Sequence, residues 1–141
     1  MKVQKLNFKN SREGYSIYIG TNILNILPKK IKVTCPKTKK IAIIIDKKVP
    51  KKFYFALKKK LRRYNLVFIQ FGADEKAKSL KSVNNILNKM LSYNLNRTDL
   101  VISVGGGVTG DVAGFVSSVY KRGINFINIP TTLLAQVDSA I

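Results

Sequence analysis

The sequence predicts an α/β fold, a doubly wound and mostly parallel sheet with flanking helices. Two observations support this prediction. Short runs of β-branched and other apolar residues recur along the chain, and stretches with helical periodicity separate them. Such repeated alternation of strands and helices is typical of a parallel sheet with helices on its faces. The 141 residues suit one domain, so we assign residues 1–141 to a single α/β unit.

The first third of the chain predicts a strand pair and a short helix. Gln4–Phe8 and Tyr15–Ile19 alternate weakly on either side of the turn-forming stretch NSREG, which favours a hairpin. A short helix is expected over Asn22–Leu27, with Pro28 ending it. Lys29–Lys40 is expected to be a basic loop or edge segment.

The middle third predicts two strands and two amphipathic helices. Ile41–Ile45 is a continuous apolar run that fits a strand buried on both faces, and it ends at Asp46. Lys51–Tyr64 has an apolar helical stripe with the basic residues off it, and Leu66–Phe71 is the next strand. Ser79 is a candidate N-cap for a second helix. We expect the buried face of that helix to contain Leu80, Val83, Ile86, Leu87, Met90 and Leu91.

The last third predicts two more strands. Leu100–Val104 is a strand, and a glycine-rich segment leaves its end and leads into a helix over Asp111–Tyr120. Gly123 ends that helix, and Ile124–Ile129 is the fourth strand of the layer. An apolar helix then starts near Thr132 and has barely three turns before the sequence stops. We therefore expect the domain to be incomplete at its C-terminal end.

The composition excludes several kinds of site. A single cysteine, Cys35, rules out an internal disulfide and a cysteine-based zinc site. The chain has no histidine, so an imidazole base or a histidine-bound metal cannot be completed within it, and we assign no metal ligand. No apolar run approaches the roughly 18 residues of a membrane span. The N-terminus has no hydrophobic signal region, so we expect a cytoplasmic protein.

The net charge of +19 raises the question of nucleic-acid binding. Lysine far outnumbers arginine and is spread along the whole chain, which favours general lysine enrichment over a dedicated nucleic-acid reader. A basic nucleic-acid-binding module, with tight and salt-sensitive binding, is one alternative function. A decayed remnant without activity is another.

The segment VGGGVTGDVAG contains Gly105, Gly107 and Gly110 at the spacing G-x-G-x-x-G. Glycines between a strand and a helix let the main chain approach a phosphate, and the N–H groups of the helix start then face the anion. The alternative is that they only pack the helix tightly on the strand. A first-strand dinucleotide fingerprint would also need an acid about twenty residues later, and Asn125 and Asn128 lie there instead.

Scarce polar groups follow other predicted strands. Asp46 could accept hydrogen bonds from ribose hydroxyls, with helix capping as the alternative. The Asp111 carboxylate interacts favourably with the dipole of the helix at whose start it lies, so its position is explained even without a ligand. Thr131 and Thr132 follow the fourth strand. They could cap the next helix or contact a cofactor phosphate, and the sequence does not decide between these two interpretations. Asp138 lies in an apolar helix and would need a partner or a wet cavity, which favours a polar site there.

The run DLVISVGGGVTGDVAGFVSSVYKRGINFINIPTTLLAQVDSAI, residues Asp99–Ile141, resembles the nucleotide-binding segment of the 3-dehydroquinate synthase family. Its long combination GGGVxGDxAGF, Y-x-RG and IPTTLLAQVDS carries the resemblance. Upstream, Asp46 and the turn Glu75–Lys78 are similar to that family's acid and its G-E-x-x-K element. Asp74 departs from the pattern, because the family usually has glycine there.

The resemblance implies the NAD-binding, Rossmann-like domain of a two-domain, homodimeric lyase of the shikimate pathway, the route to chorismate and the aromatic amino acids. Such enzymes convert 3-deoxy-D-arabino-heptulosonate 7-phosphate to 3-dehydroquinate and phosphate, with transient oxidation by NAD. Their zinc or cobalt ion is held by a glutamate and two histidines in an α-helical C-terminal domain that is absent from this chain. Residues 1–141 alone are therefore expected to bind NAD without catalysis. Related sugar-phosphate cyclases and polyol dehydrogenases are the alternatives.

The resemblance also implies roles for individual residues. Asp138 is expected to reach the substrate's ring or hydroxyls, and Arg122 to grip the substrate phosphate, across the dimer interface if necessary. The cofactor-binding set comprises Asp46, Glu75, Lys78, Gly106, Gly107, Val108, Thr109, Gly110, Asp111, Thr131, Thr132, Leu134 and Ser139.

Overall fold

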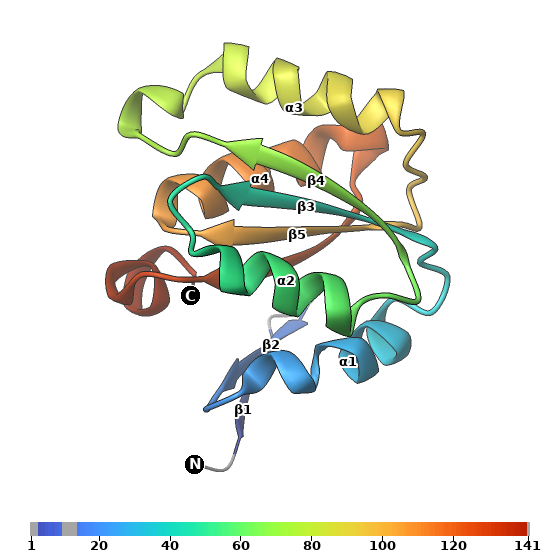
Figure 1. Cartoon of the computed structure of the whole chain (residues 1–141), viewed down its shortest axis with the longest axis vertical. Coiled ribbons are helices and arrows are strands. Elements are labelled where there is room, and N and C mark those ends of the chain that lie inside the picture. Colours follow the sequence, from blue (N-terminus) through green and yellow to red (C-terminus); the bar gives the residue numbers. More distant parts are fainter. Residues whose placement is uncertain (1–2, 10–13, 141) are drawn as a thin grey trace.

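The computed structural model describes residues 3–9 and 14–140, so most of the predicted NSREG turn and Ile141 lie outside the described residues. Its centre is a four-stranded parallel sheet with the strand order β4-β3-β5-β6 (Figure 1). The strands are β3 (Lys40–Asp46), β4 (Asn65–Phe71), β5 (Leu100–Gly105) and β6 (Asn125–Pro130). The predicted fold class and all four predicted strands of the layer are confirmed, with bounds that differ by a residue or two.

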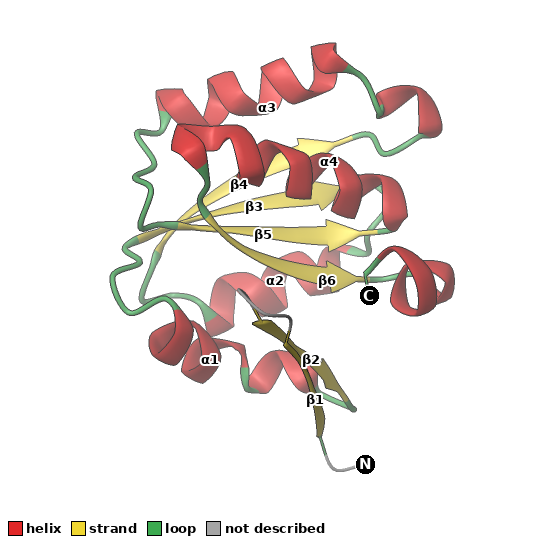
Figure 2. Ribbon diagram, turned by 180° about the vertical axis from the view of Figure 1, so that it is seen from behind, coloured by secondary structure: helices red, strands yellow, loops and turns green. Residues whose placement is uncertain are grey.

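Helices cover both faces of this sheet (Figure 2). One face packs on α1 (Leu27–Thr34) and α2 (Lys51–Lys60), and the other on α3 (Leu80–Ser92) and α4 (Gly107–Val119). Successive side chains of a strand point to opposite faces, and β3 is buried toward both. Ile41, Ile43 and Ile45 join the core under α1 and α2, while Ala42 and Ile44 join the core under α3 and α4.

The predicted hairpin is confirmed as a small antiparallel sheet of its own. Strand β1 (Gln4–Lys9) pairs with β2 (Gly14–Ile19), and neither strand joins the four-stranded sheet. The rings of Phe8 and Tyr15 stack across the pair with their centroids 5.2 Å apart.

The helix predicted over Asn22–Leu27 is wrong, and so is the loop predicted to follow it. A 3₁₀ turn covers Ile23–Asn25, and Pro28 lies in the first turn of α1 instead of ending a helix. Proline is well suited to that position, because the N–H group that it lacks would have no partner within the helix. The basic segment is helical as far as Thr34, since Leu27 and Ile31 bury one side of it against the sheet.

Other helix boundaries also differ from the prediction. Helix α2 stops at Lys60, four residues before Tyr64, and a turn from Leu61 to Tyr64 leads into β4. Helix α4 starts at Gly107, so the glycine segment forms its first turns. It is followed by a 3₁₀ turn over Tyr120–Arg122, and a π-helix covers Ala135–Ser139.

Helix α3 supports its predicted cap but not its whole predicted face. The Ser79 hydroxyl accepts a hydrogen bond from the N–H of Ser82, as expected of an N-cap. Within the predicted apolar face, Leu80 and Leu91 are exposed, whereas the other four residues pack into the core. Among the described residues, no helix combines the length and apolar character needed to cross a membrane.

Candidate functional site

The strand order places a reversal of chain direction between two central strands. Strand β3 comes first in the layer, and the chain moves outward to β4 before it crosses back to β5 and β6. In open parallel sheets, ligands bind outside the carboxyl ends of the strands at such a switch point. Here Asp46 at the end of β3 and Gly105 at the end of β5 flank that point.

A cleft of about 530 Å³ opens at this edge of the sheet. Six of the predicted cofactor-binding residues line it, and they come from the ends of β3, β5 and β6. The lining residues are Asp46, Lys48, Val49, Pro50, Lys52, Phe53, Ala73, Gly106, Gly107, Val108, Thr131 and Thr132.

The glycine segment brings the start of α4 to the cleft. Gly106 precedes the helix in an extended conformation, and Gly107 and Val108 form its first turn. Helix N-termini carry N–H groups without partners inside the helix and a partial positive charge, which together favour an anion. Tight packing also explains the glycines, since a Cβ on Gly107 would lie 3.0 Å from the Ser139 hydroxyl. The packing explanation for the segment is therefore supported, and phosphate binding stays a prediction.

Asp46 does not cap a helix, because α2 starts at Lys51 with Pro50 before it. Its Oδ1 instead accepts a hydrogen bond of 2.9 Å from the N–H of Lys48, which holds the turn after β3. The side chain is half-buried and lines the cleft, so its carboxylate is accessible to a ligand.

Thr131 and Thr132 enter the cleft after β6. The N–H of Thr131 donates to the carbonyl of Gly105 at 2.8 Å, which ties the two strand ends together. The Thr132 hydroxyl accepts from the N–H of Ala135, so the capping interpretation of this residue is confirmed. Thr132 therefore both caps the following helical turn and lines the cleft.

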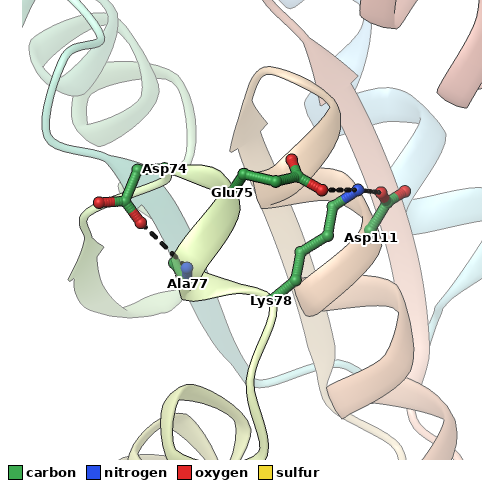
Figure 3. A network of polar contacts seen from close by, with 5 residues as sticks. All are labelled: Asp74, Glu75, Ala77, Lys78 and Asp111. Atoms are coloured by element: carbon green, nitrogen blue, oxygen red, sulfur yellow. Dashed lines mark hydrogen bonds and ion pairs between the residues drawn. The ribbon is translucent and has the colours of Figure 1, made fainter.

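Beside the cleft, Lys78 bridges two carboxylates (Figure 3). Its Nζ lies 3.1 Å from Glu75 and 3.1 Å from Asp111, so it joins the turn after β4 to α4. The hydrogen bond with Asp111, followed by that with Glu75, raises the pKa of Lys78. In the same turn, Asp74 caps the 3₁₀ helix by accepting from the N–H of Ala77 at 2.9 Å. Asp74, which lies where the resembled family usually has glycine, thus stabilises this turn.

The remaining predicted residues are more scattered. The Thr109 side chain is buried under Gly105, and its Oγ1 has no hydrogen-bond partner among the described residues. Gly110 packs on the amide of Asn128. Leu134 and Asp138 are exposed, and the polar site expected at Asp138 stays a prediction.

Arg122 lies away from the cleft. Helix α4 starts at the carboxyl edge of the sheet and runs back along it, and 13 residues span about 20 Å. Arg122 follows the far end of the helix, near the start of β6, with a positive φ of 67°. Within one chain it therefore does not join the other predicted residues.

The cleft also contains residues that the sequence analysis did not select. The β3–α2 connection and the start of α2 contribute one wall, formed by Lys48, Val49, Pro50, Lys52 and Phe53. These residues follow directly after a strand that ends in Asp46, and this position could have indicated that they line a site. The sequence analysis instead interpreted the basic residues of this segment only as the solvated face of a helix.

The family model for the N-terminal part of 3-dehydroquinate synthase matches residues 68–141. The chain belongs to the 3-dehydroquinate synthase family. A relative named 3-dehydroquinate synthase from Pelagibacter ubique is 45% identical over this whole chain, and another from Clostridium acetobutylicum is 36% identical over 99% of it. The chain spans 38% and 39% of the length of these two relatives.

Solved structures of the same superfamily share the fold. A 2-deoxy-scyllo-inosose synthase complexed with carbaglucose-6-phosphate, NAD⁺ and Co²⁺ matches with a TM-score of 0.86 and 26% identity, over 96% of this chain and 37% of that one. A 2-epi-5-epi-valiolone synthase from Streptomyces hygroscopicus, with NAD⁺ and Zn²⁺ bound, matches with a TM-score of 0.64 and 28% identity, over 75% and 31%.

Proposed function

We propose that this chain forms the NAD-binding part of a 3-dehydroquinate synthase, which converts 3-deoxy-D-arabino-heptulosonate 7-phosphate to 3-dehydroquinate and phosphate. Relatives with that name match the whole chain at up to 45% identity, and the NAD⁺-bound cyclases have its fold. The observation that carries the proposal is the meeting of Asp46, the Gly106–Gly107 helix start and Thr131–Thr132 on one cleft.

The residues of the cleft fit a dinucleotide. The start of α4 suits the pyrophosphate, because its N–H groups are accessible beside two glycines. The Asp46 carboxylate suits the ribose hydroxyls, since only its Oδ1 is engaged with the backbone of the turn. Thr131 and Thr132 close the cleft on the β6 side and orient the cofactor.

When bound, NAD accepts and returns a hydride, which makes the transient oxidation in this reaction possible. The chain's own residues hold the cofactor and the substrate in place for it. The exposed Asp138 carboxylate is proposed to bind the substrate hydroxyls. Arg122 follows the end of α4 and precedes β6, at the opposite edge of the sheet, so we assign its phosphate contact to the site of a second copy in a homodimer.

The chain does not fit the divalent metal of the family. It contains no histidine, and its described residues include no group of three or more histidine, cysteine, aspartate or glutamate side chains able to hold an ion. We derive no step through a metal. Residues 1–141 are proposed to bind NAD without turning over the substrate, in the cytoplasm.

Titration of the 141-residue chain with NAD⁺ tests the cleft. Asp46→Ala removes the ribose acceptor and should weaken binding at least tenfold, because a hydrogen bond to a charged group contributes about 1.5–3 kcal/mol. Asp46→Asn keeps an oxygen for the turn bond to Lys48 and should have a smaller effect. Asp74→Ala, which removes a carboxylate outside the cleft, is the matched control. Equal NAD⁺ affinity of Asp46→Ala and the wild type would contradict the proposal.

A further inference from the structure

A polar contact lies under the first turns of α4. The hydroxyl of Ser103, in the middle of β5, donates a hydrogen bond of 2.5 Å to Oδ1 of Asn128, which is its partner in the register of β5 and β6. Ser103 is fully buried and Asn128 is half-buried. Both side chains lie on the face of the sheet that packs against α3 and α4, because Val101, two residues before Ser103, joins that core. The bond holds the Asn128 amide in one orientation.

Two glycines of α4 face β6 closely. A Cβ added at Gly110 would lie 3.2 Å from Nδ2 and 3.3 Å from Oδ1 of Asn128, which is closer than side chains normally pack. One turn further along, a Cβ added at Gly114 would lie 3.7 Å from the ring of Phe126, an ordinary van der Waals distance. Residues four apart on a helix, like residues two apart on a strand, share one face, so the two pairs mark the line along which α4 lies on β6. The helix approaches the strand most tightly at Asn128.

The contact at Asn128 connects two sides of the cleft. On the helix side, the N–H of Gly110 donates to the carbonyl of Gly106 at 3.1 Å, so Gly110 is fixed to the turn whose first residues line the cleft. On the strand side, two residues separate Asn128 from Thr131, which lines the cleft after β6. Asn128 itself does not line the cleft. The height of Gly110 above Asn128 therefore sets where the start of α4 lies relative to the β6 side.

We propose that Asn128 is a positioning residue for NAD: held by Ser103, it sets the height of α4 on the sheet and so places the N–H groups of the helix start at the pyrophosphate. The inference rests on the proposed function, because it takes the pyrophosphate to lie at the start of α4. An anion gains from these N–H groups only at hydrogen-bond distance, so a small displacement of the helix start lowers the affinity. Asn128 acts through the glycine turn and not through a contact with the cofactor.

NAD⁺ titrations of a double-mutant cycle in the 141-residue chain test this role. Gly110→Ala should weaken NAD⁺ binding about fivefold or more, because the added methyl group pushes α4 away from the Asn128 amide. In the Asn128→Ala background the same methyl group has room, so Gly110→Ala should change the Kd there by less than about twofold. The matched control, Gly114→Ala, adds a methyl group to the same helix at an ordinary contact distance and should leave the Kd within about twofold of the wild type.

Two further variants separate affinity from stability. Asn128→Ala and Ser103→Ala remove the partners of the hydrogen bond without adding a clash, and each should weaken NAD⁺ binding about threefold. They decide the question if Gly110→Ala fails to fold. Circular dichroism and urea unfolding establish that each variant is folded at the temperature of the titration, so that a loss of stability alone would leave the Kd unchanged.

The possible outcomes separate the inference from the proposed function. A Kd for Asn128→Ala equal to that of the wild type would overturn the inference and leave the proposed function intact. An equal loss from Gly110→Ala in both backgrounds would overturn it as well, because the methyl group would then act without Asn128. Absence of NAD⁺ binding by the wild type would remove the proposed function together with the inference.

Discussion

Asp46 and Asp99 lie at opposite edges of the same sheet and are bonded in contrasting ways. Asp99, directly before β5, is 1% exposed and accepts from the N–H groups of Lys39, Lys40 and Asn96 at 3.0, 2.8 and 2.7 Å. Asp46, at the end of β3, is half-buried and accepts from one N–H group. The first carboxylate is fully used by the fold, whereas the second is available to a ligand.

The surroundings of the two aspartates differ in the same way. At the amino edge, the Tyr120 hydroxyl donates to the carbonyl of Leu95 at 2.9 Å, and the Thr38 hydroxyl donates to that of Thr98 at 3.1 Å. At the carboxyl edge, the N–H of Thr131 also ties two strand ends together, but closely packed glycines there border an open cleft. The amino edge is therefore closed by buried hydrogen bonds, whereas the carboxyl edge leaves the Asp46 carboxylate accessible at the cleft.

Asp99→Ala should have the largest effect on stability. It removes a buried charged acceptor from three backbone N–H groups, and we expect a loss of about 4 kcal/mol in the free energy of unfolding. Asp99→Asn keeps one acceptor oxygen and should lose about 2 kcal/mol. Urea unfolding followed by circular dichroism measures both.

Asp46→Ala and Asp74→Ala are the controls for Asp99→Ala, because each loses a single backbone hydrogen bond near the surface. Both should lose about 1 kcal/mol or less. If Asp46→Ala were as destabilising as Asp99→Ala, the contrast between a structural and a binding aspartate would be wrong.

Gly105→Ala tests the carboxyl edge and should have the next largest effect. A Cβ on Gly105 would clash with the Thr109 side chain and lie 3.1 Å from the Cβ of Asp46. Thr109 is fully buried and cannot move aside, so we expect a loss of about 2–3 kcal/mol from overpacking. Denaturant unfolding gives this value.

Gly72→Ala is the matched control for Gly105→Ala. Nothing lies within 4 Å of its added Cβ, so stability should stay within about 0.5 kcal/mol of the wild type. Similar unfolding midpoints for the two alanine variants would show that close packing does not constrain the glycine segment.

The contrast between the edges also explains what could be predicted from the sequence. The buried strands were predictable because Ile41–Ile45 is apolar at every position, a pattern that local composition carries by itself. The position of Asp46 and Thr131 on one cleft was predictable because the carboxyl ends of parallel strands share one edge. These predictions depend on strand direction, which the alternation of strands and helices defines.

What could not be predicted depends on contacts between distant segments. Pro28 was interpreted as a helix end, because the sequence does not show that Leu27 and Ile31 bury a helix against the sheet. The bridge from Lys78 to Asp111 requires the turn after β4 to lie beside α4. The lysines that line the cleft follow from the path of the β3–α2 connection, which no local pattern encodes.

Tyr120→Phe returns to the amino edge with the smallest expected effect. The variant leaves the Leu95 carbonyl without its donor and should lose about 1 kcal/mol below pH 9. Burial, and then the nearby Asp99 charge, raise the pKa of Tyr120 above its ordinary value of 10.0. The folded state thus holds this proton more tightly than the unfolded state, so the contribution of the hydroxyl is fully present below pH 10 and is lost as the pH rises above it.

The stability gap between wild type and Tyr120→Phe should therefore stay constant up to about pH 9 and narrow as the pH rises above 10. The two proteins differ only at residue 120, so the difference between their urea unfolding curves at each pH isolates the tyrosine. A gap that did not narrow at all as the pH rose above 10 would mean that the hydroxyl is hydrated and that the amino edge is more open than the hydrogen bonds around Asp99 imply.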